Sequence, residues 1–114
     1  MYDLEERTFQ FAKRVYAFSR EIPYSIQSQQ ILKQLIRSAS SIGANYIEAN
    51  ESFSRKDFIY RIKICKKEAK ETIYWLRLLD QKESDEFEGV LKEAKELRSI
   101  FGKIYQSSNR KPKS

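Results

Sequence analysis

Residues 54–79 read SRKDFIYRIKICKKEAKETIYWLRLL, and this stretch has the clearest helical pattern in the chain. Its apolar and small side chains recur in steps of four and three residues, which is the spacing of one face of an α-helix. Ser54, followed three residues later by Asp57, is a typical helix start with a serine cap. Trp75 and Leu78 widen the apolar face, as a bundle helix with two neighbours requires. The residues of this face are Phe58, Ile62, Cys65, Ala69, Thr72, Leu76 and Leu79.

Three further segments show the same periodicity, at Asp3–Arg20, Ser25–Glu51 and Ser84–Tyr105. Pro23 ends the first of them, because the residue before a proline is disfavoured in the α conformation. Gly43 lies inside the second, where glycine costs about 1 kcal/mol relative to alanine. This glycine therefore indicates that a neighbouring helix approaches closely.

The connections between these segments are short, so consecutive helices are expected to be antiparallel neighbours. The predicted fold is an all-α, antiparallel up-down four-helix bundle with short connections, forming one domain over residues 1–105. A three-helix arrangement with one broken helix is the alternative. Residues 106–114 (QSSNRKPKS) are polar and basic, and we expect them to form a disordered tail.

The composition excludes several classes of protein. The chain has 114 residues, one cysteine and no histidine, so it lacks an internal disulfide and the commonest catalytic base and metal ligand. It shows no P-loop or Rossmann fingerprint. The N-terminus is charged from the third residue, unlike a signal peptide, and no apolar run approaches the roughly twenty residues of a membrane span. We expect a cytoplasmic protein that is not an enzyme and needs no cofactor.

Two features could in principle carry chemistry, and both favour a structural interpretation. Cys65 lies in the apolar face of its helix, where a small buried core residue is expected. Glu48, Glu51 and Asp57 flank the turn before the third helix and could gather around a metal ion. Bundle di-metal sites, however, use Glu-x-x-His motifs, which are absent here, so no metal site is predicted. The remaining polar residues of the turn favour helix capping and ion pairs over a recognition surface; they are Asn45, Asn50, Ser52, Ser54 and Arg55.

The basic residues of the third helix are the strongest candidate for a binding site. The chain has a formal net charge of +6 and a pI of about 9.4, which suits a polyanionic partner. At about 100° per residue, seven basic side chains fall within an arc of roughly 120°, whereas Asp57, Glu68 and Glu71 lie on the other side. Such a strip can neutralise successive phosphates. Alternatively, Lys66 and Lys70 pair with acids of a neighbouring helix or subunit. The predicted nucleic-acid-binding residues are Arg55, Lys56, Lys63, Lys66, Lys67, Lys70 and Arg77.

Four tyrosines do not fit the apolar faces and are predicted to be exposed: Tyr16, Tyr24, Tyr60 and Tyr74. Exposed tyrosines anchor subunit interfaces and also stack on unpaired bases. The interface interpretation is favoured.

The chain also resembles a known family. Residues 11–23 (FAKRVYAFSREIP) and 34–79 are similar to S23-like proteins, which are named for genes within 23S rRNA intervening sequences. The most specific parts are RSA at 37–39, SIGAN at 41–45, EAN at 48–50 and KEAxET at 67–72. The accessory variability proteins of diversity-generating retroelements look similar in the same regions.

This resemblance implies a four-helix bundle that assembles as a ring-like homo-oligomer, a pentamer in particular. It also implies nucleic-acid binding, a reverse transcriptase partner in the retroelement branch, and no catalytic residues. Ring symmetry would multiply the basic strip and raise avidity for a long polyanion. The first hypothesis is therefore a homo-oligomer that binds RNA or structured DNA through phosphates. The alternative is an oligomeric adaptor whose basic surface docks a protein partner.

Overall fold

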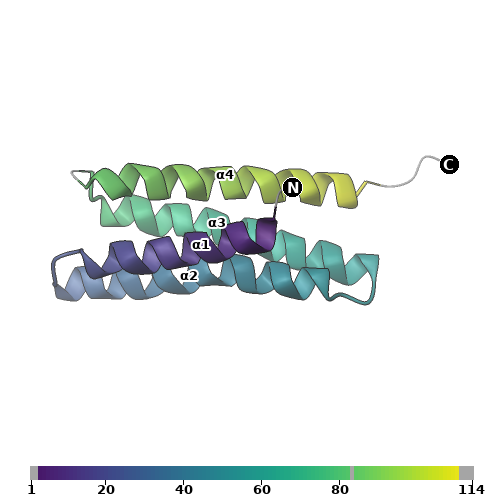
Figure 1. The fold of residues 1–114 in the computed structure, drawn as a ribbon, viewed down its shortest axis with the longest axis horizontal. Helices are drawn as coiled ribbons and strands as arrows, with labels where there is room; N and C mark the ends of the chain where they lie inside the picture. The colour runs from purple at the N-terminus through teal and green to yellow at the C-terminus, as the bar shows by residue number, and fades with distance from the viewer. Residues whose placement is uncertain (1–2, 83, 111–114) are drawn as a thin grey trace.

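The computed structural model describes residues 3–82 and 84–110 of the chain. Within them the chain forms α1 (Leu4–Arg20), α2 (Ile26–Asn50), α3 (Arg55–Leu79) and α4 (Asp85–Ser108). The helices run alternately up and down in an elongated bundle of 56 × 27 × 21 Å (Figure 1). The predicted all-α, up-down four-helix bundle is thus confirmed, and no helix is broken as the three-helix alternative required.

Side chains fix three of the four helix starts. Asp3 accepts a hydrogen bond from the Glu6 N–H at 3.1 Å, and Ser54 accepts one from the Asp57 N–H at 3.1 Å. Ser25 and Ser28 form a reciprocal capping box before α2. Each such cap satisfies a backbone N–H that lacks a partner inside its helix, and is worth about 1 kcal/mol. The helix boundaries predicted from sequence are therefore set by local chemistry.

The four apolar faces meet in one core. α1 packs against α2 and α4, and α3 packs against the same two helices, so α1 and α3 occupy diagonal corners (Figure 1). The fully buried side chains come from all four helices and include Phe11, Leu35, Ile42, Ile62, Leu76, Leu97 and Phe101. Leu78 differs from the prediction, because its side chain is 52% exposed and does not widen the buried face of α3.

A bidentate ion pair joins α1 and α4. Arg7 Nε lies 2.7 Å from Glu93 Oε2, and Arg7 Nη2 lies 2.7 Å from Glu93 Oε1. The hydrogen bonds from Arg7 lower the pKa of Glu93 below its ordinary value, against the partial burial that alone would raise it. This pair and the Arg14–Glu86 pair, at 3.3 Å, join helices that are far apart in the sequence.

α4 continues to Ser108, three residues beyond the predicted end at Tyr105, so the start of the expected tail is helical. Residues 111–114, which hold most of that tail's charge, lie outside the described residues. Among the helices of the described ranges, none is sufficiently long and apolar to cross a lipid bilayer.

Candidate nucleic-acid interface

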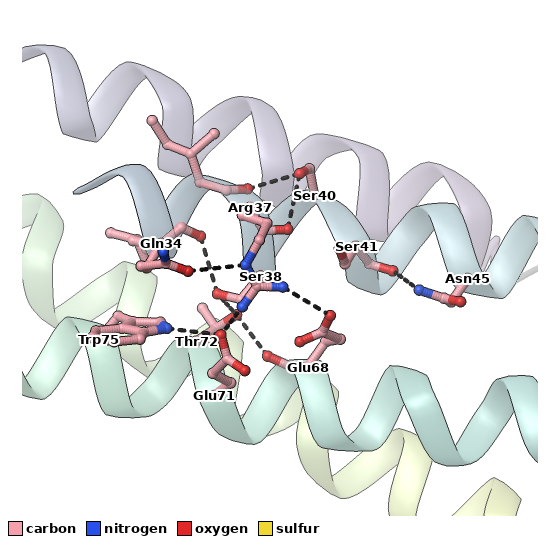
Figure 2. A network of polar contacts seen from close by, with 12 residues as sticks. Gln34, Arg37, Ser38, Ser40, Ser41, Asn45, Glu68, Glu71, Thr72 and Trp75 are labelled. Atoms are coloured by element: carbon pink, nitrogen blue, oxygen red, sulfur yellow. Dashed lines mark hydrogen bonds and ion pairs between the residues drawn. The ribbon is translucent and has the colours of Figure 1, made fainter. Parts of the chain in front are cut away.

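On the side of α3 that faces α2, one arginine holds two glutamates. Arg37 Nη1 lies 3.2 Å from Glu68 Oε2, and the other arm of the guanidinium pairs with Glu71 Oε2 (Figure 2). Trp75 Nε1 donates to the same Glu71 oxygen at 2.9 Å, and Arg37 Nε donates to Gln34 Oε1 at 3.0 Å. The acids of mid-α3 are therefore engaged within the bundle and contribute little negative charge to its outer surface.

Small polar groups fill the core beside this cluster. The Thr72 hydroxyl lies 2.8 Å from the Glu68 carbonyl oxygen and 2.9 Å from the Ser38 hydroxyl (Figure 2). Cys65 is fully buried, and its thiol donates to the Ile42 carbonyl oxygen at 3.4 Å. Burial raises the pKa of the Cys65 thiol to about 12, so the thiolate is not formed near neutral pH. The sequence interpretation of Cys65 as a core residue is confirmed.

The motif residues of α2 likewise make packing contacts. A Cβ atom at Gly43 would lie 2.9 Å from Thr8 Oγ1, so α1 approaches α2 closely at this point, as the mid-helix glycine indicated. Arg61 Nη1 donates to Asn45 Oδ1 at 2.9 Å, and Asn50 Nδ2 donates to Glu5 Oε2 at 2.7 Å. Among the turn residues, Ser54 caps α3 as expected, whereas Asn45 and Asn50 make hydrogen bonds between helices rather than caps or ion pairs.

The opposite side of α3 is basic. Lys56, Lys63, Lys67, Lys70 and Arg77 are all exposed. Within residues 3–82 and 84–110, none of these five side chains forms an ion pair. Lys66 forms no ion pair in these ranges either, so the predicted alternative, in which Lys66 and Lys70 pair with acids of a neighbouring helix, is not observed within the described part of the subunit. An exposed row of like charges without acidic partners repels itself and favours an anionic ligand.

Two of the predicted lysines have an aromatic neighbour on α4. The Nζ atoms of Lys63 and Lys66 each lie 5.9 Å from the centre of the Tyr105 ring. Lys66 is half-buried, and its Cε atom would be in ordinary contact, at 3.8 Å, with a Cβ placed at Gly102. The ring attracts both ammonium groups weakly and orients them along the boundary between α3 and α4.

Arg55 has a different environment from the other six predicted residues. Its Nε donates to the Ser108 carbonyl oxygen at 3.0 Å, and its Nη2 donates to the Arg110 carbonyl oxygen at 3.1 Å. The guanidinium thus caps the C-terminal end of α4, where a positive charge is favourable. This contact explains how α4 remains helical beyond Tyr105.

Sequence reasoning missed two basic residues of α4. Gly102 and Tyr105 face Lys66 and Lys63, and residues spaced by three and four lie on the same side of a helix. That spacing places the exposed Arg98 and Lys95 on the edge of α4 nearest α3. Residues 95, 98, 102 and 105 share one side of α4 by their spacing. The sequence alone does not reveal that this side faces α3, so the two basic residues could not be assigned to the strip.

The carboxylates near the α2–α3 turn line a shallow surface hollow. Glu48, Glu51 and Asp57 border it together with the exposed Phe53 and Tyr60. Across the described ranges, no group of three or more cysteine, aspartate and glutamate side chains is arranged to hold a metal ion. The start of α3 therefore has carboxylates on its α2 side, whereas its basic residues lie on its α4 side.

Comparison with known proteins places the chain in a family. The sequence pattern described as 23S rRNA-intervening sequence protein matches residues 2–106. A crystal structure of a protein of unknown function from the S23 ribosomal protein family of Bacteroides thetaiotaomicron superposes with a TM-score of 0.79 and 32% sequence identity. The match covers 91% of this chain and 99% of that one. No protein of curated function matches. The chain belongs to the 23S rRNA-intervening sequence protein family.

Proposed function

We propose that the chain is a non-enzymatic, homo-oligomeric protein that binds RNA or structured DNA through the basic side of α3. The observation that carries the proposal is the separation of charge on this helix. Glu68 and Glu71 are held by Arg37, whereas Lys63, Lys67 and Lys70 are exposed without an acidic partner in the described residues. A polyanion supplies the counter-charge that the fold does not.

The site is built for phosphates rather than for reading base edges. Lys56, Lys63, Lys70 and Arg77 recur every seven residues along a straight helix, so adjacent members lie about 10 Å apart. Lysines act as point charges on flexible stems, which suits contacts to a backbone of varying sequence. Arg98 and Lys95 of α4 widen the strip, and the homo-oligomer that the family resemblance implies would multiply it.

The test is binding of a fluorescent structured RNA, measured by anisotropy over a range of salt concentrations. We expect affinity to fall steeply with salt, and Lys63→Glu with Lys70→Glu to weaken binding at least 100-fold, on the order of 3 kcal/mol. The matched control is Lys13→Glu with Lys33→Glu, which changes the net charge equally on α1 and α2. Equal binding by the two double variants, both with unchanged helical content, would show that the strip is not the site.

Size-exclusion chromatography with light scattering tests the assembly, with and without nuclease. An oligomer that carries nuclease-sensitive material supports the proposal. A nucleic-acid-free oligomer that captures a stoichiometric, nuclease-resistant protein from its native host favours the adaptor hypothesis, in which the basic strip docks a protein such as a reverse transcriptase. A monomer without nucleic acid contradicts the assembly and the avidity that it provides.

A further inference from the structure

An eight-residue pattern occurs twice on α3. Residues 56–63 read KDFIYRIK and residues 70–77 read KETIYWLR, so both segments have a lysine, an acid, an isoleucine, a tyrosine, an aliphatic residue and a basic residue at equivalent positions. The two segments are separated by fourteen residues, which places them about 21 Å apart along the helix and about 40° apart around it. They therefore present nearly the same side chains to the same side of the molecule.

Core packing explains only part of this repetition. Ile62 and Leu76, at equivalent positions, are fully buried, and a bundle helix requires apolar residues there. The equivalent tyrosines are not buried, because Tyr60 is 62% exposed and Tyr74 is 57% exposed. The basic residues at both ends of each pattern are exposed as well. Packing within the subunit gives no reason for repeating an exposed tyrosine between two exposed cations.

Each tyrosine lies one helical turn from both of its basic neighbours. Tyr60 follows Lys56 by four residues and precedes Lys63 by three, and Tyr74 has the same relation to Lys70 and Arg77. Side chains three and four residues apart are neighbours on a helix surface. Lys67 lies seven residues from both tyrosines and is exposed between them. The outer side of α3 is thus a row in which aromatic rings alternate with cations.

We propose that each pattern is a half-site for one unpaired base, and that the ligand of the basic strip is single-stranded nucleic acid. The tyrosine ring stacks on the base, its two basic neighbours contact the adjoining phosphates, and Lys67 contacts the strand between the half-sites. This inference rests on the proposed function and narrows its ligand. A duplex hides the faces of its bases within the stack, so it engages the cations but not the rings.

The same surface is poorly suited to a subunit interface. The cores of protein interfaces are depleted of lysine, and burying Tyr60 or Tyr74 against a second copy would remove water from the flanking cations. Trp75 fixes the Tyr74 ring in an edge-to-face contact with centres 4.9 Å apart, and Glu71 holds the indole. Tyr74 is therefore a preordered ring on the surface, as a stacking platform requires.

The two half-sites differ in their acidic surroundings. Glu71 of the second pattern is neutralised by Arg37, whereas the hollow beside Tyr60 is lined by Glu48, Glu51 and Asp57. A phosphate near Tyr60 meets more negative charge than one near Tyr74. Tyr74→Ala is accordingly expected to weaken binding more than Tyr60→Ala.

The experiment measures binding of the full chain to two fluorescent probes. One is an oligouridine of about ten nucleotides, a length within the site sizes of single-strand binders, and the other is a blunt-ended RNA duplex without unpaired bases. We expect Tyr60→Ala and Tyr74→Ala, averaged over the two variants, to weaken oligouridine binding about tenfold and duplex binding less than about twofold. Tyr60→Phe with Tyr74→Phe retains the rings and should restore binding. The control is Phe9→Ala on α1, where an aromatic side chain that is 55% exposed follows Glu5 and Glu6 and has one cation, Lys13, 5.7 Å from its ring centre.

The results separate this inference from the proposed function. If Lys63→Glu with Lys70→Glu abolishes binding of both probes while Tyr60→Ala with Tyr74→Ala binds oligouridine as the parent does, the stacking role is wrong and phosphate binding stands. Tighter binding of the duplex than of oligouridine by the parent would also overturn it. If neither probe binds the parent in low salt, both proposals fail.

Discussion

The two sides of α3 carry charges of opposite sign, and they differ in whether those charges have partners within the protein. On the side facing α2, Arg37 brings Glu68 and Glu71 into one hydrogen-bonded cluster with Trp75 (Figure 2). On the outer side, Lys63, Lys67 and Lys70 are exposed without acidic partners in the described ranges. The comparison teaches that packing against a neighbour can make the exposed surface of a basic helix still more basic, because Arg37 of α2 neutralises two of the three acids that α3 carries against its eight basic residues.

The largest expected effect comes from breaking the inner side. Arg37→Ala removes the partner of two carboxylates whose side chains are only 12% and 29% exposed. Leaving the Glu68 carboxylate without its donor is costly, whereas Glu71 keeps the Trp75 indole, so we expect a loss of about 2 kcal/mol in the free energy of unfolding. Urea denaturation followed by circular dichroism measures it, with Lys33→Ala on the exposed part of α2 as the control. A loss no larger than that of the control would contradict the structural role of this cluster.

A second test uses the thiol on the inner side. The pKa of Cys65 is raised from 9.0 to about 12 in the folded protein. Between these two pH values the thiol is deprotonated in the unfolded chain but still protonated in the folded one. The folded state then binds more protons, and its stability must fall as pH rises, by up to about 1.4 kcal/mol per pH unit from this group. We expect Cys65→Ala to reduce the alkaline slope of unfolding free energy against pH. Identical slopes for parent and variant would show that the thiol is accessible to water.

The contact between α1 and α4 extends the comparison to another pair of helices. Because Arg7 lowers the pKa of Glu93, the stability from this pair is fully present above about pH 4.5 and is lost as pH falls through the lower folded pKa. Glu93→Gln should cost about 1 kcal/mol at neutral pH and remove this part of the acid dependence. The free energies of unfolding of the parent and the variant, each measured against pH, should become equal in acid. A constant difference at every pH would refute the assignment.

The smallest expected effect on folding comes from the outer side. Lys67→Gln removes an exposed charge without an ion pair, so the free energy of unfolding should change by less than about 0.5 kcal/mol. The same substitution should lower the slope of log affinity against log salt by about one, the share of a single phosphate contact. A stability loss comparable to that of Arg37→Ala would mean that Lys67 has a structural partner, and the distinction between the two sides of α3 would disappear.

Much of the fold was predictable because its signals are local. The spacing of Phe58, Ile62 and Cys65 depends only on helix geometry, and the caps at Ser25 and Ser54 depend on residues three positions apart. Even the basic arc of α3 follows from its own sequence. Leu78 was placed on the wrong side because an apolar residue at the edge of a helical face fits either assignment, and the neighbouring helix decides.

The sequence by itself determined the helices, their order, the core positions and the side of α3 on which cations gather, since each of these depends on residues within a few turns of one another. Only the tertiary structure decided which charges have partners. Arg37 meets Glu68 and Arg55 caps α4 because consecutive helices pack side by side and bring together residues 31 and 53 positions apart. Pairing between helices depends on their relative rotation and register, and no single helix carries that information.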